Sequence, residues 1–289
     1  MTIIKQVAKL ALKKLGYEIK LIEQGNLPLS VPRWIQEIEI KPNTDDVISE
    51  GWVHNVLHMA NKYYSPTNLN FLRTRIGEDY RIKYIAYTLD FRDQRVLELG
   101  PLEGHWSILI EKMGAKENIS LEAKQKNYIK CMRIKNKYGL SHTKFYQLDI
   151  EDLYNHKTIP PFTGKFDLIF CIGLFYHLPN PPKALTWFLS QSDTLFLGTH
   201  YVEKQFIECY HQEGIFSDAS VDYRGESYKG KWYSENVEAD SSGMSPHSFW
   251  PYEVDLIRML EQAGYQQIQV LGKDYLNNFP HITILAKRL

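Results

Sequence analysis

An alternation of short apolar runs with amphipathic stretches, beginning near residue 94, constrains the fold of this chain more than any other feature. Buried strands that alternate with helices are typical of a parallel sheet covered by helices on both faces, so the sequence predicts a doubly wound α/β fold. Five runs have the length and apolar content of such strands: 95–99, 118–121, 144–148, 166–172 and 194–198. Helical periods separate several of them, at 106–113, 124–138 and 181–190.

The two ends of the chain extend this pattern. A helical period at 251–263 is followed by two strands, 267–271 and 281–287, whose short connection predicts an antiparallel hairpin completing a seven-stranded sheet. Residues 1–75 predict a helical extension ahead of the main domain at 76–289. The first helix of this extension is amphipathic, which fits either a membrane-surface anchor or packing on the protein itself. Its short length favours packing.

Charge and cysteine content restrict the partners and the compartment. The 34 basic and 34 acidic residues cancel, so a nucleic acid or an anionic membrane would have to be bound by a local patch. Three cysteines are too few and too widely spaced for a disulfide framework or a CxxC metal site, and we expect a cytoplasmic protein. No apolar run is long enough to predict a transmembrane segment.

A glycine-containing turn follows the first predicted strand, where the ligand of such a sheet is expected to bind. The turn reads ELGPLEG, from Glu98 to Gly104. Its G-x-x-x-G spacing, with Leu102 between the glycines, departs from the G-x-G-x-x-G of dinucleotide sites. A carboxylate at Glu98 would repel a phosphate and attract a sulfonium or an ammonium group. The turn therefore favours a cationic ligand over NAD.

Acidic residues also end the second and third strands. Glu122 stands where a carboxylate can accept hydrogen bonds from both hydroxyls of a ribose. Asp149 can accept a hydrogen bond from an adenine amine while Ile150 covers the ring; alternatively, Asp149 only caps the following helix. The joint occurrence of Glu98, Glu122 and Asp149, in order and at successive strand ends, is a stronger signal than any one of them.

Four runs in this region, VLELGPLEGHWS, SLEA, YQLDIEDL and FDLIFCIGLFYHLPNP, resemble the class I S-adenosylmethionine (SAM)-dependent methyltransferase family over about residues 80–200. The resemblance implies a Rossmann-like methyltransferase fold, with SAM as cofactor and S-adenosylhomocysteine (SAH) as product. Leu102 departs from the family pattern, because many members carry glycine there. The cofactor-binding residues that the resemblance implies are Glu98, Gly100, Pro101, Gly104, Glu122, Asp149, Ile150 and Cys171.

Two segments resemble one subgroup of this family more closely. CIGLFYHLPNP is similar to a segment of the bacterial enzymes that carboxymethylate the wobble uridine of tRNA, and of their relatives. The stretch Ser248–Pro251, expected to open the helix that ends before Gly264, is also similar to that subgroup. The rest of the tRNA-enzyme pattern is not present, so the resemblance implies kinship without implying the same substrate.

Candidate catalytic residues follow the fourth and fifth strands. Methyl transfer to oxygen or nitrogen needs a base, and His177 and His200 are the two candidates, because imidazole titrates near neutral pH. Tyr176 can shape the sulfonium pocket through its ring face. Alternatively, His177 makes only a structural hydrogen bond, or the two histidines bind a metal together with His247. No tight ligand spacing supports a metal, so we expect none.

Residues 201–250 form an aromatic segment that we expect to be a substrate-side insertion. An aromatic wall with a few charges suits a compact organic acceptor; alternatively, these rings form a second small core. The residues that we expect to contact the substrate are Tyr201, Tyr228, Trp232 and Trp250.

These features predict a SAM-dependent methyltransferase that acts on an oxygen or nitrogen of a small-molecule acceptor. One alternative is a tRNA wobble-uridine (carboxy)methyltransferase, for which Arg81 or Arg224 would have to supply a cation beside a carboxylated SAM. The basic run between Lys124 and Lys137 could contact RNA, but a solvated helix face explains it more simply, and the neutral net charge favours a small molecule over nucleic acid. A non-catalytic SAM-binding module is the alternative from another class.

Overall fold

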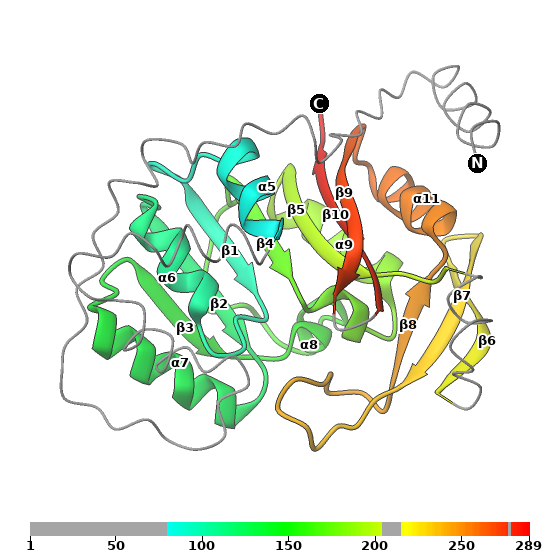
Figure 1. The fold of residues 1–289 in the computed structure, drawn as a ribbon, viewed down its shortest axis with the longest axis horizontal. Helices are drawn as coiled ribbons and strands as arrows, with labels where there is room; N and C mark the ends of the chain where they lie inside the picture. Colours follow the sequence, from blue (N-terminus) through cyan, green and yellow to red (C-terminus); the bar gives the residue numbers. More distant parts are fainter. Residues whose placement is uncertain (1–79, 204–214, 277–278) are drawn as a thin grey trace. The chain divides into compact units, whose positions relative to one another are not determined.

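A computed structural model describes residues 80–203, 215–276 and 279–289 (Figure 1). The chain divides into two compact units, which we name after a strand of each and describe separately. The predicted extension at 1–75 lies outside the described residues. The β1 unit contains the described residues 80–170 and 236–244. The β5 unit contains the described residues 171–203, 215–235, 245–276 and 279–289.

The core of the β1 unit is a set of parallel strands. β1 and β2 are paired so that Glu98 lies opposite Ser120. Val96, Leu97 and Leu99 are buried, as expected for a parallel strand that is covered on both faces. The strands are β1 (Arg95–Leu99), β2 (Glu117–Glu122) and β3 (Thr143–Gln147), with β2 parallel to both of the others.

Helices connect these strands because apolar residues recur at helical spacing. In the longest, α7, Cys131, Ile134 and Tyr138 form the buried face, whereas Arg133 is exposed. α7 ends at Gly139, whose φ of 60° lets the chain leave the helix in a left-handed conformation. The helices of this unit are α5 (Tyr80–Thr88), α6 (His105–Lys112), α7 (Gln125–Tyr138) and α8 (Ile150–Tyr154).

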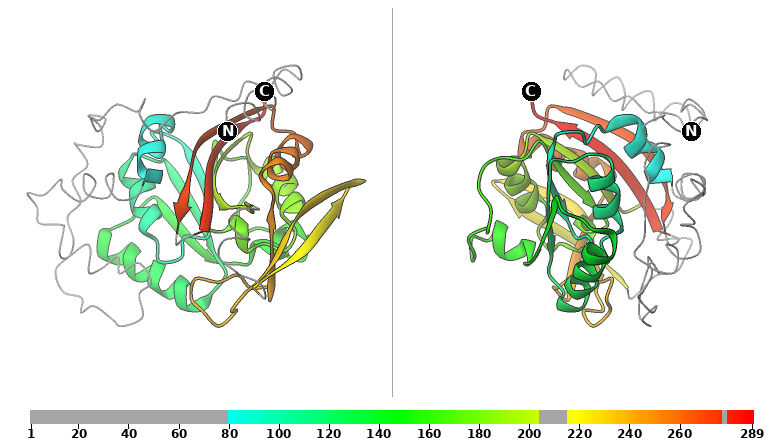
Figure 2. Two further views of the ribbon diagram at one scale, coloured as in Figure 1. Left: turned by 45° about the vertical axis from the view of Figure 1, so that its right-hand side comes forward. Right: turned by 90° about the vertical axis from the view of Figure 1, so that its left-hand side faces the viewer.

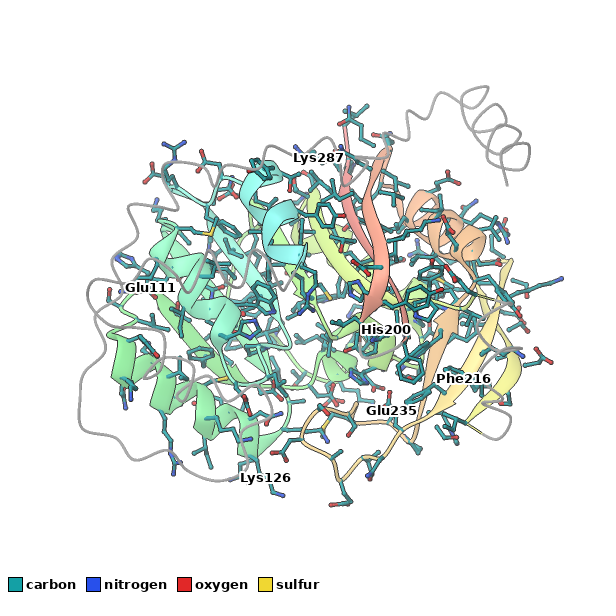
Figure 3. All side chains as sticks on the ribbon, in the orientation of Figure 1. Glu111, Lys126, His200, Phe216, Glu235 and Lys287 are labelled. Carbon is teal, nitrogen blue, oxygen red and sulfur yellow. The ribbon has the colours of Figure 1, made fainter. Side chains whose placement is uncertain are left out.

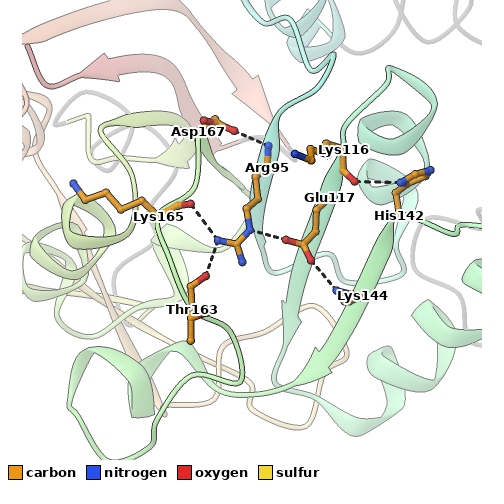
Figure 4. A network of polar contacts seen from close by, with 8 residues as sticks. All are labelled: Arg95, Lys116, Glu117, His142, Lys144, Thr163, Lys165 and Asp167. Carbon is orange, nitrogen blue, oxygen red and sulfur yellow. Dashed lines mark hydrogen bonds and ion pairs between the residues drawn. The ribbon is translucent and has the colours of Figure 1, made fainter.

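A polar network fixes the amino-terminal ends of β1 and β2 (Figure 4). The Arg95 guanidinium pairs with Glu117, which also binds Lys144 of β3 at 2.8 Å. The Arg95 backbone N–H donates to Asp167 at 2.8 Å. Because a ligand of a parallel sheet binds at the carboxyl ends of its strands, this network is structural.

The β5 unit contains the carboxyl-terminal hairpin. β10 is antiparallel to both β5 and β9, as the sequence predicts. β4 (Leu168–Ile172) begins in the β1 unit and ends in the β5 unit. The complete strand order is β3-β2-β1-β4-β5-β10-β9, a mostly parallel seven-stranded sheet. The remaining elements of this group are η2 (Phe175–His177), α9 (Pro181–Gln191), β5 (Thr194–His200), α11 (Glu253–Ala263), β9 (Gln267–Leu276) and β10 (Phe279–Lys287).

The aromatic segment forms an antiparallel sheet of its own, which the sequence did not predict. Figure 2 shows β6 and β7 as a long hairpin with β8 beside β7. The stretch Ser248–Pro251 was expected to open a helix; it lies in β8, and α11 begins after Tyr252. Phe249 and Trp250 are both buried, and as neighbours in a strand they point to opposite faces of the small sheet, so the pairing with β7 buries both rings. The strands are β6 (Phe216–Tyr223), β7 (Glu226–Ser234) and β8 (His247–Pro251).

Candidate functional site

The turn after β1 uses three left-handed residues in alternation. Gly100, Leu102 and Gly104 have φ values of 68°, 56° and 82°. Leu102 therefore takes a backbone conformation that costs a non-glycine residue about 1–2 kcal/mol. The sequence spacing G-x-x-x-G concealed this pattern, because leucine occupies its middle position. Pro101 is buried in the same turn, and its carbonyl accepts a hydrogen bond from the Gly104 N–H at 2.9 Å.

Glu122 links this turn to the start of α7. Its Oε2 accepts from the Leu102 N–H at 3.1 Å, and its Oε1 accepts from the Lys124 N–H at 2.9 Å. Burial raises the pKa of Glu122 to about 7, against the lowering effect of these backbone donors. The predicted ribose-binding carboxylate thus lies at the carboxyl end of β2, beside the glycine-containing turn.

Glu98 points into the core of the β1 unit. Its Oε2 accepts hydrogen bonds from Ser107 Oγ at 2.5 Å and Asn118 Nδ2 at 2.9 Å, and burial raises its pKa. These bonds join β1 to α6 and β2, so Glu98 connects the strand before the turn with the helix after it. Its predicted position around the methionine part of SAM stays a prediction.

Asp149 caps α8, as in the alternative to adenine binding that the sequence left open. Its Oδ1 accepts from the Glu151 N–H at 2.9 Å. Ile150 is buried directly after it. Burial raises the pKa of the Asp149 carboxyl. The cap uses one carboxylate oxygen, and the predicted contact with an adenine amine stays a prediction.

Cys171 is the one predicted cofactor residue in the β5 unit. It is buried at the end of β4, where desolvation raises the pKa of its thiol to about 12. A neutral, buried thiol behaves as a small apolar side chain.

His177 is held by a carboxylate that the sequence analysis missed. His177 Nδ1 lies 2.7 Å from Glu235 Oε1, and the side chains are 12% and 2% exposed. Ser248 Oγ donates to the same oxygen at 2.7 Å. Alternation along β7 and β8 explains this meeting, because Tyr233, Glu235, Ser248 and Trp250 share one face of the small sheet. That period of two was the available signal.

An aromatic cluster covers the same face. Tyr176 lies with its ring centroid 4.3 Å from those of both His177 and His200. The His200 ring stacks on Trp250 at 4.9 Å, and Tyr233 stacks on the same indole at 5.0 Å. We define the aromatic cluster as Tyr176, His200, Phe216, Tyr233, Trp250 and Phe279. Figure 3 labels two of its members, His200 and Phe216, and also Glu235.

Two polar groups lie within this cluster. The Trp250 indole is 3% exposed, and its Nε1–H is buried without a hydrogen-bond partner among the described residues. His200 was expected to follow the fifth strand; it is the last residue of β5, and its Nδ1 donates to the Pro280 carbonyl at 3.0 Å. His200 is therefore a buried ring within the cluster.

The structure does not gather all the predicted substrate residues. Only Trp250 belongs to the aromatic cluster. Tyr228 and Trp232 lie on the opposite face of the small sheet, where Tyr228 packs beneath the Arg258 guanidinium and Trp232 against Phe249. Tyr201 is buried and donates its hydroxyl hydrogen bond to Glu203.

The connection between β7 and β8 is held by α7 within the β1 unit. Lys124 Nζ donates to the carbonyls of Val237 at 2.6 Å and Ala239 at 2.8 Å. Lys130 Nζ lies 2.9 Å from Asp240 Oδ2 and 3.2 Å from Glu103 Oε1. The expectation that the basic run forms a solvated face is therefore wrong for Lys124 and Lys130, whose ammonium groups bind the chain itself.

Among the described residues, no three side chains of His, Cys, Asp or Glu gather as a metal site, so His177, His200 and His247 do not form one. No helix within the described ranges is long and apolar enough to cross a membrane. The cytoplasmic location stays a prediction from the cysteine content.

The strand order and the ligand-side turn define the class I methyltransferase fold. Known structures agree with this assignment. The N-terminal domain of EvdMO1 with SAH bound has a TM-score of 0.56 at 21% identity, over 93% of this chain and 98% of that one. Magnesium protoporphyrin IX methyltransferase from Synechocystis PCC 6803 with bound SAH has a TM-score of 0.52 at 15% identity, over 81% and 94%.

Residues 73–270 match the model of a methyltransferase domain family, and the chain belongs to this family. It is a SAM-dependent methyltransferase. The tRNA U34 carboxymethyltransferase of Campylobacter hominis is 25% identical over 118 residues, which are 40% of this chain and 39% of that protein. The enzyme of Campylobacter jejuni subsp. jejuni serotype O:23/36 is 37% identical over 65 residues, or 22% and 20%. The chain thus matches two fifths or less of the length of these curated relatives.

Proposed function

We propose that this methyltransferase transfers the methyl group of SAM to an oxygen or nitrogen of a small-molecule acceptor, with His177 as the general base. The observation that carries the proposal is the position of His177, at the border of the aromatic cluster with its Nδ1 bound to Glu235. A hydrogen bond at one ring nitrogen leaves the other to accept a proton. A base beside aromatic faces fits a compact organic acceptor.

The reaction is an in-line displacement at the methyl carbon. The acceptor oxygen or nitrogen forms a bond to this carbon while the bond from carbon to sulfur breaks, and its electron pair stays on sulfur as SAH forms. The acceptor proton passes to His177 Nε2. The buried Trp250 N–H is a donor that can orient a polar atom of the acceptor.

The cofactor is proposed to lie along the carboxyl ends of β1, β2 and β3. Glu122 would accept hydrogen bonds from the ribose hydroxyls, and Asp149 would accept one from the adenine amine beside Ile150. Gly100, Pro101 and Gly104 would form the turn against the methionine part, above Glu98. Their arrangement within one unit supports this assignment.

The contacts of the lysines in the basic run favour a small-molecule acceptor over tRNA. Lys124 donates to carbonyls of the chain's own 236–244 loop and Lys130 pairs with Asp240, so neither of these ammonium groups is left to contact phosphates. In a solved structure of the EvdMO1 N-terminal domain, SAH and D-fucose were present; its TM-score is 0.54 at 22% identity, over 75% of this chain and 83% of that one. We propose a hydroxylated, sugar-like acceptor as the first class to examine.

The names of the Campylobacter relatives favour a second candidate, carboxymethyl transfer to tRNA. A carboxylated cofactor needs a cation beside its added carboxylate. Arg81 is buried with its guanidinium 5.3 Å from the Trp106 ring, whereas Arg224 is exposed in the β6–β7 turn. Arg81 is therefore the better candidate of the two.

A paired assay separates the two candidates. The full chain is incubated with methyl-labelled SAM and a panel of sugars and nucleotide sugars, and in parallel with carboxylated SAM and unmodified tRNA. Label in a small acceptor, lost in His177→Ala, supports the proposal. Carboxymethylated tRNA together with unlabelled small acceptors would replace it by the second candidate.

A further inference from the structure

We propose that Glu235 is a positioning residue, which fixes His177 in the tautomer that leaves Nε2 as the proton acceptor. This inference rests on the proposed role of His177 as the base. It concerns the state of the ring before any acceptor binds, so it can be tested without knowing the acceptor.

The chemistry of the Glu235 contact indicates the proton position. An ionised Glu235 only accepts hydrogen bonds, and its 2.7 Å contact through Oε1 then places the proton on His177 Nδ1. In the neutral ring the lone pair is then on Nε2. With a hydrogen-bond donor in place of the carboxylate, Nδ1 would itself accept, and the base would face the acceptor with the wrong nitrogen.

Several contacts hold Glu235 in place. Ser248 Oγ donates to the same Oε1 at 2.7 Å, and the Glu235 backbone N–H donates to the Pro246 carbonyl at 2.9 Å. The preceding residue, Ser234, pairs with His247 in the β7–β8 ladder. A side chain that is 2% exposed and bonded through both its carboxylate and its backbone has little freedom to turn away.

The 236–244 loop begins directly after Glu235 and is fastened independently. Lys124 binds two of its carbonyls, Asn127 Nδ2 donates to the Asp240 carbonyl at 2.8 Å, and Lys130 pairs with the Asp240 carboxylate. These contacts hold the loop within the β1 unit. The alignment of the base depends on the contacts of Glu235 itself within the β5 unit, because a base must be aligned with the acceptor proton to be effective.

A merely structural ion pair is the competing explanation, and the ring tautomer distinguishes the two. We would record long-range ¹H–¹⁵N spectra of the full chain labelled with ¹⁵N-histidine, at alkaline pH and with SAH present, and assign His177 from the His177→Asn variant. The proposal predicts the Nδ1–H tautomer in the native chain. A native ring protonated on Nε2 would overturn the proposal, whatever the variants do.

Two variants complete the test. Glu235→Gln keeps the size and can donate from its amide to Nδ1, so a large share of His177 should change to the Nε2–H tautomer. Glu226→Gln makes the same exchange at the first residue of β7, the strand that ends just before Glu235; it breaks an ion pair with Arg258 away from His177 and should leave the His177 spectrum unchanged. An unchanged tautomer in Glu235→Gln would also overturn the proposal.

SAH binding separates this inference from the proposed function. Calorimetry should give equal SAH affinity for the native chain, Glu235→Gln and Glu226→Gln. If the tautomer changes as predicted but His177→Ala retains full methyl transfer, the positioning by Glu235 holds and the proposed base does not.

Discussion

The two units achieve their polar geometry in different ways. In the β1 unit the carboxylates proposed to bind the cofactor are bonded to neighbouring backbone: Glu122 to Leu102 and Lys124, and Asp149 to Glu151. In the β5 unit the central contacts join side chains far apart in sequence, such as His177 with Glu235 and His200 with Trp250. The first arrangement follows from local strand-to-helix turns, and the second depends on a sheet that forms elsewhere in the chain. Changes in the β5 unit should therefore alter chemistry, and changes in the β1 unit should alter cofactor binding and stability.

The largest effect is expected at His177. Removing a general base typically costs a factor of about 10²–10⁴ in rate, so His177→Ala should lose methyl transfer to this extent while SAH affinity is kept. Single-turnover transfer with labelled SAM measures the rate, and calorimetry measures the affinity. His247→Ala, at an exposed residue in β8, is the control. Equal loss in both variants would contradict the assignment of His177 as the general base.

The free energy of unfolding should depend on pH because burial raises the pKa of Glu122. Its pKa of about 7 in the folded state lies above the ordinary value of 4.5, so the folded state holds the proton more tightly. Stability should then be highest below about pH 4.5 for this group and fall by up to about 3 kcal/mol as pH rises to 7. Urea unfolding between pH 5 and 8 should show this slope, and Glu122→Gln should remove it.

Glu117, on the same strand, contributes to stability with the opposite pH dependence. Hydrogen bonds to Arg95 and Lys144 lower its pKa, so its contribution is present above pH 4.5 and is lost as pH falls. Glu117→Gln should therefore weaken the protein at neutral pH and leave the slope between pH 5 and 8 in place. If Glu117→Gln removed the slope between pH 5 and 8, the slope would not come from Glu122.

A smaller effect is expected at Gly104. An added Cβ has ordinary contacts at 3.5–3.7 Å, so the cost of Gly104→Ala comes from its φ of 82° and should be about 1 kcal/mol. Gly139→Ala, with φ 60° and open space around it, should cost a similar amount. Only the Gly104 variant should also weaken SAH binding. Equal SAH affinity in both variants would argue against the turn as part of the cofactor site.

The smallest effect concerns Lys124. Lys124→Ala removes the donors to Val237 and Ala239, so amide hydrogen exchange in the 236–244 loop should accelerate about tenfold. The expected change in unfolding free energy is about 1 kcal/mol. Lys126→Ala, an exposed residue of α7 labelled in Figure 3, should change neither quantity measurably. Similar exchange in both variants would mean that Lys124 does not hold the loop.

The difference between the units also explains what the sequence could predict. Strand ends are local features, so the positions of Glu98, Glu122 and Asp149 followed from apolar runs and their spacing. Leu102 was recognised as a departure, but its left-handed conformation is a backbone property that a leucine does not signal. The antiparallel hairpin at the sheet edge was predicted because its two strands are adjacent in the chain.

Prediction failed where distant residues had to meet. Glu235 lies 58 residues from His177, and only the pairing of β7 with β8 brings Ser248 to the same carboxylate. Ser248–Pro251 was expected to open a helix from its resemblance to the subgroup, but it lies in β8 and pairs with β7. The basic residues of α7 have helical spacing, but the loop that binds Lys124 and Lys130 lies more than a hundred residues away.

Calorimetric titration of the full chain with SAH is the decisive test of the proposed cofactor site, with Asp149→Ala as the variant and NAD as the control ligand. We expect SAH to bind the native chain, Asp149→Ala to bind it at least tenfold more weakly because the adenine amine loses its acceptor, and NAD not to bind. Absence of SAH binding, or equal binding by the variant, would contradict a cofactor site at the carboxyl ends of β1, β2 and β3.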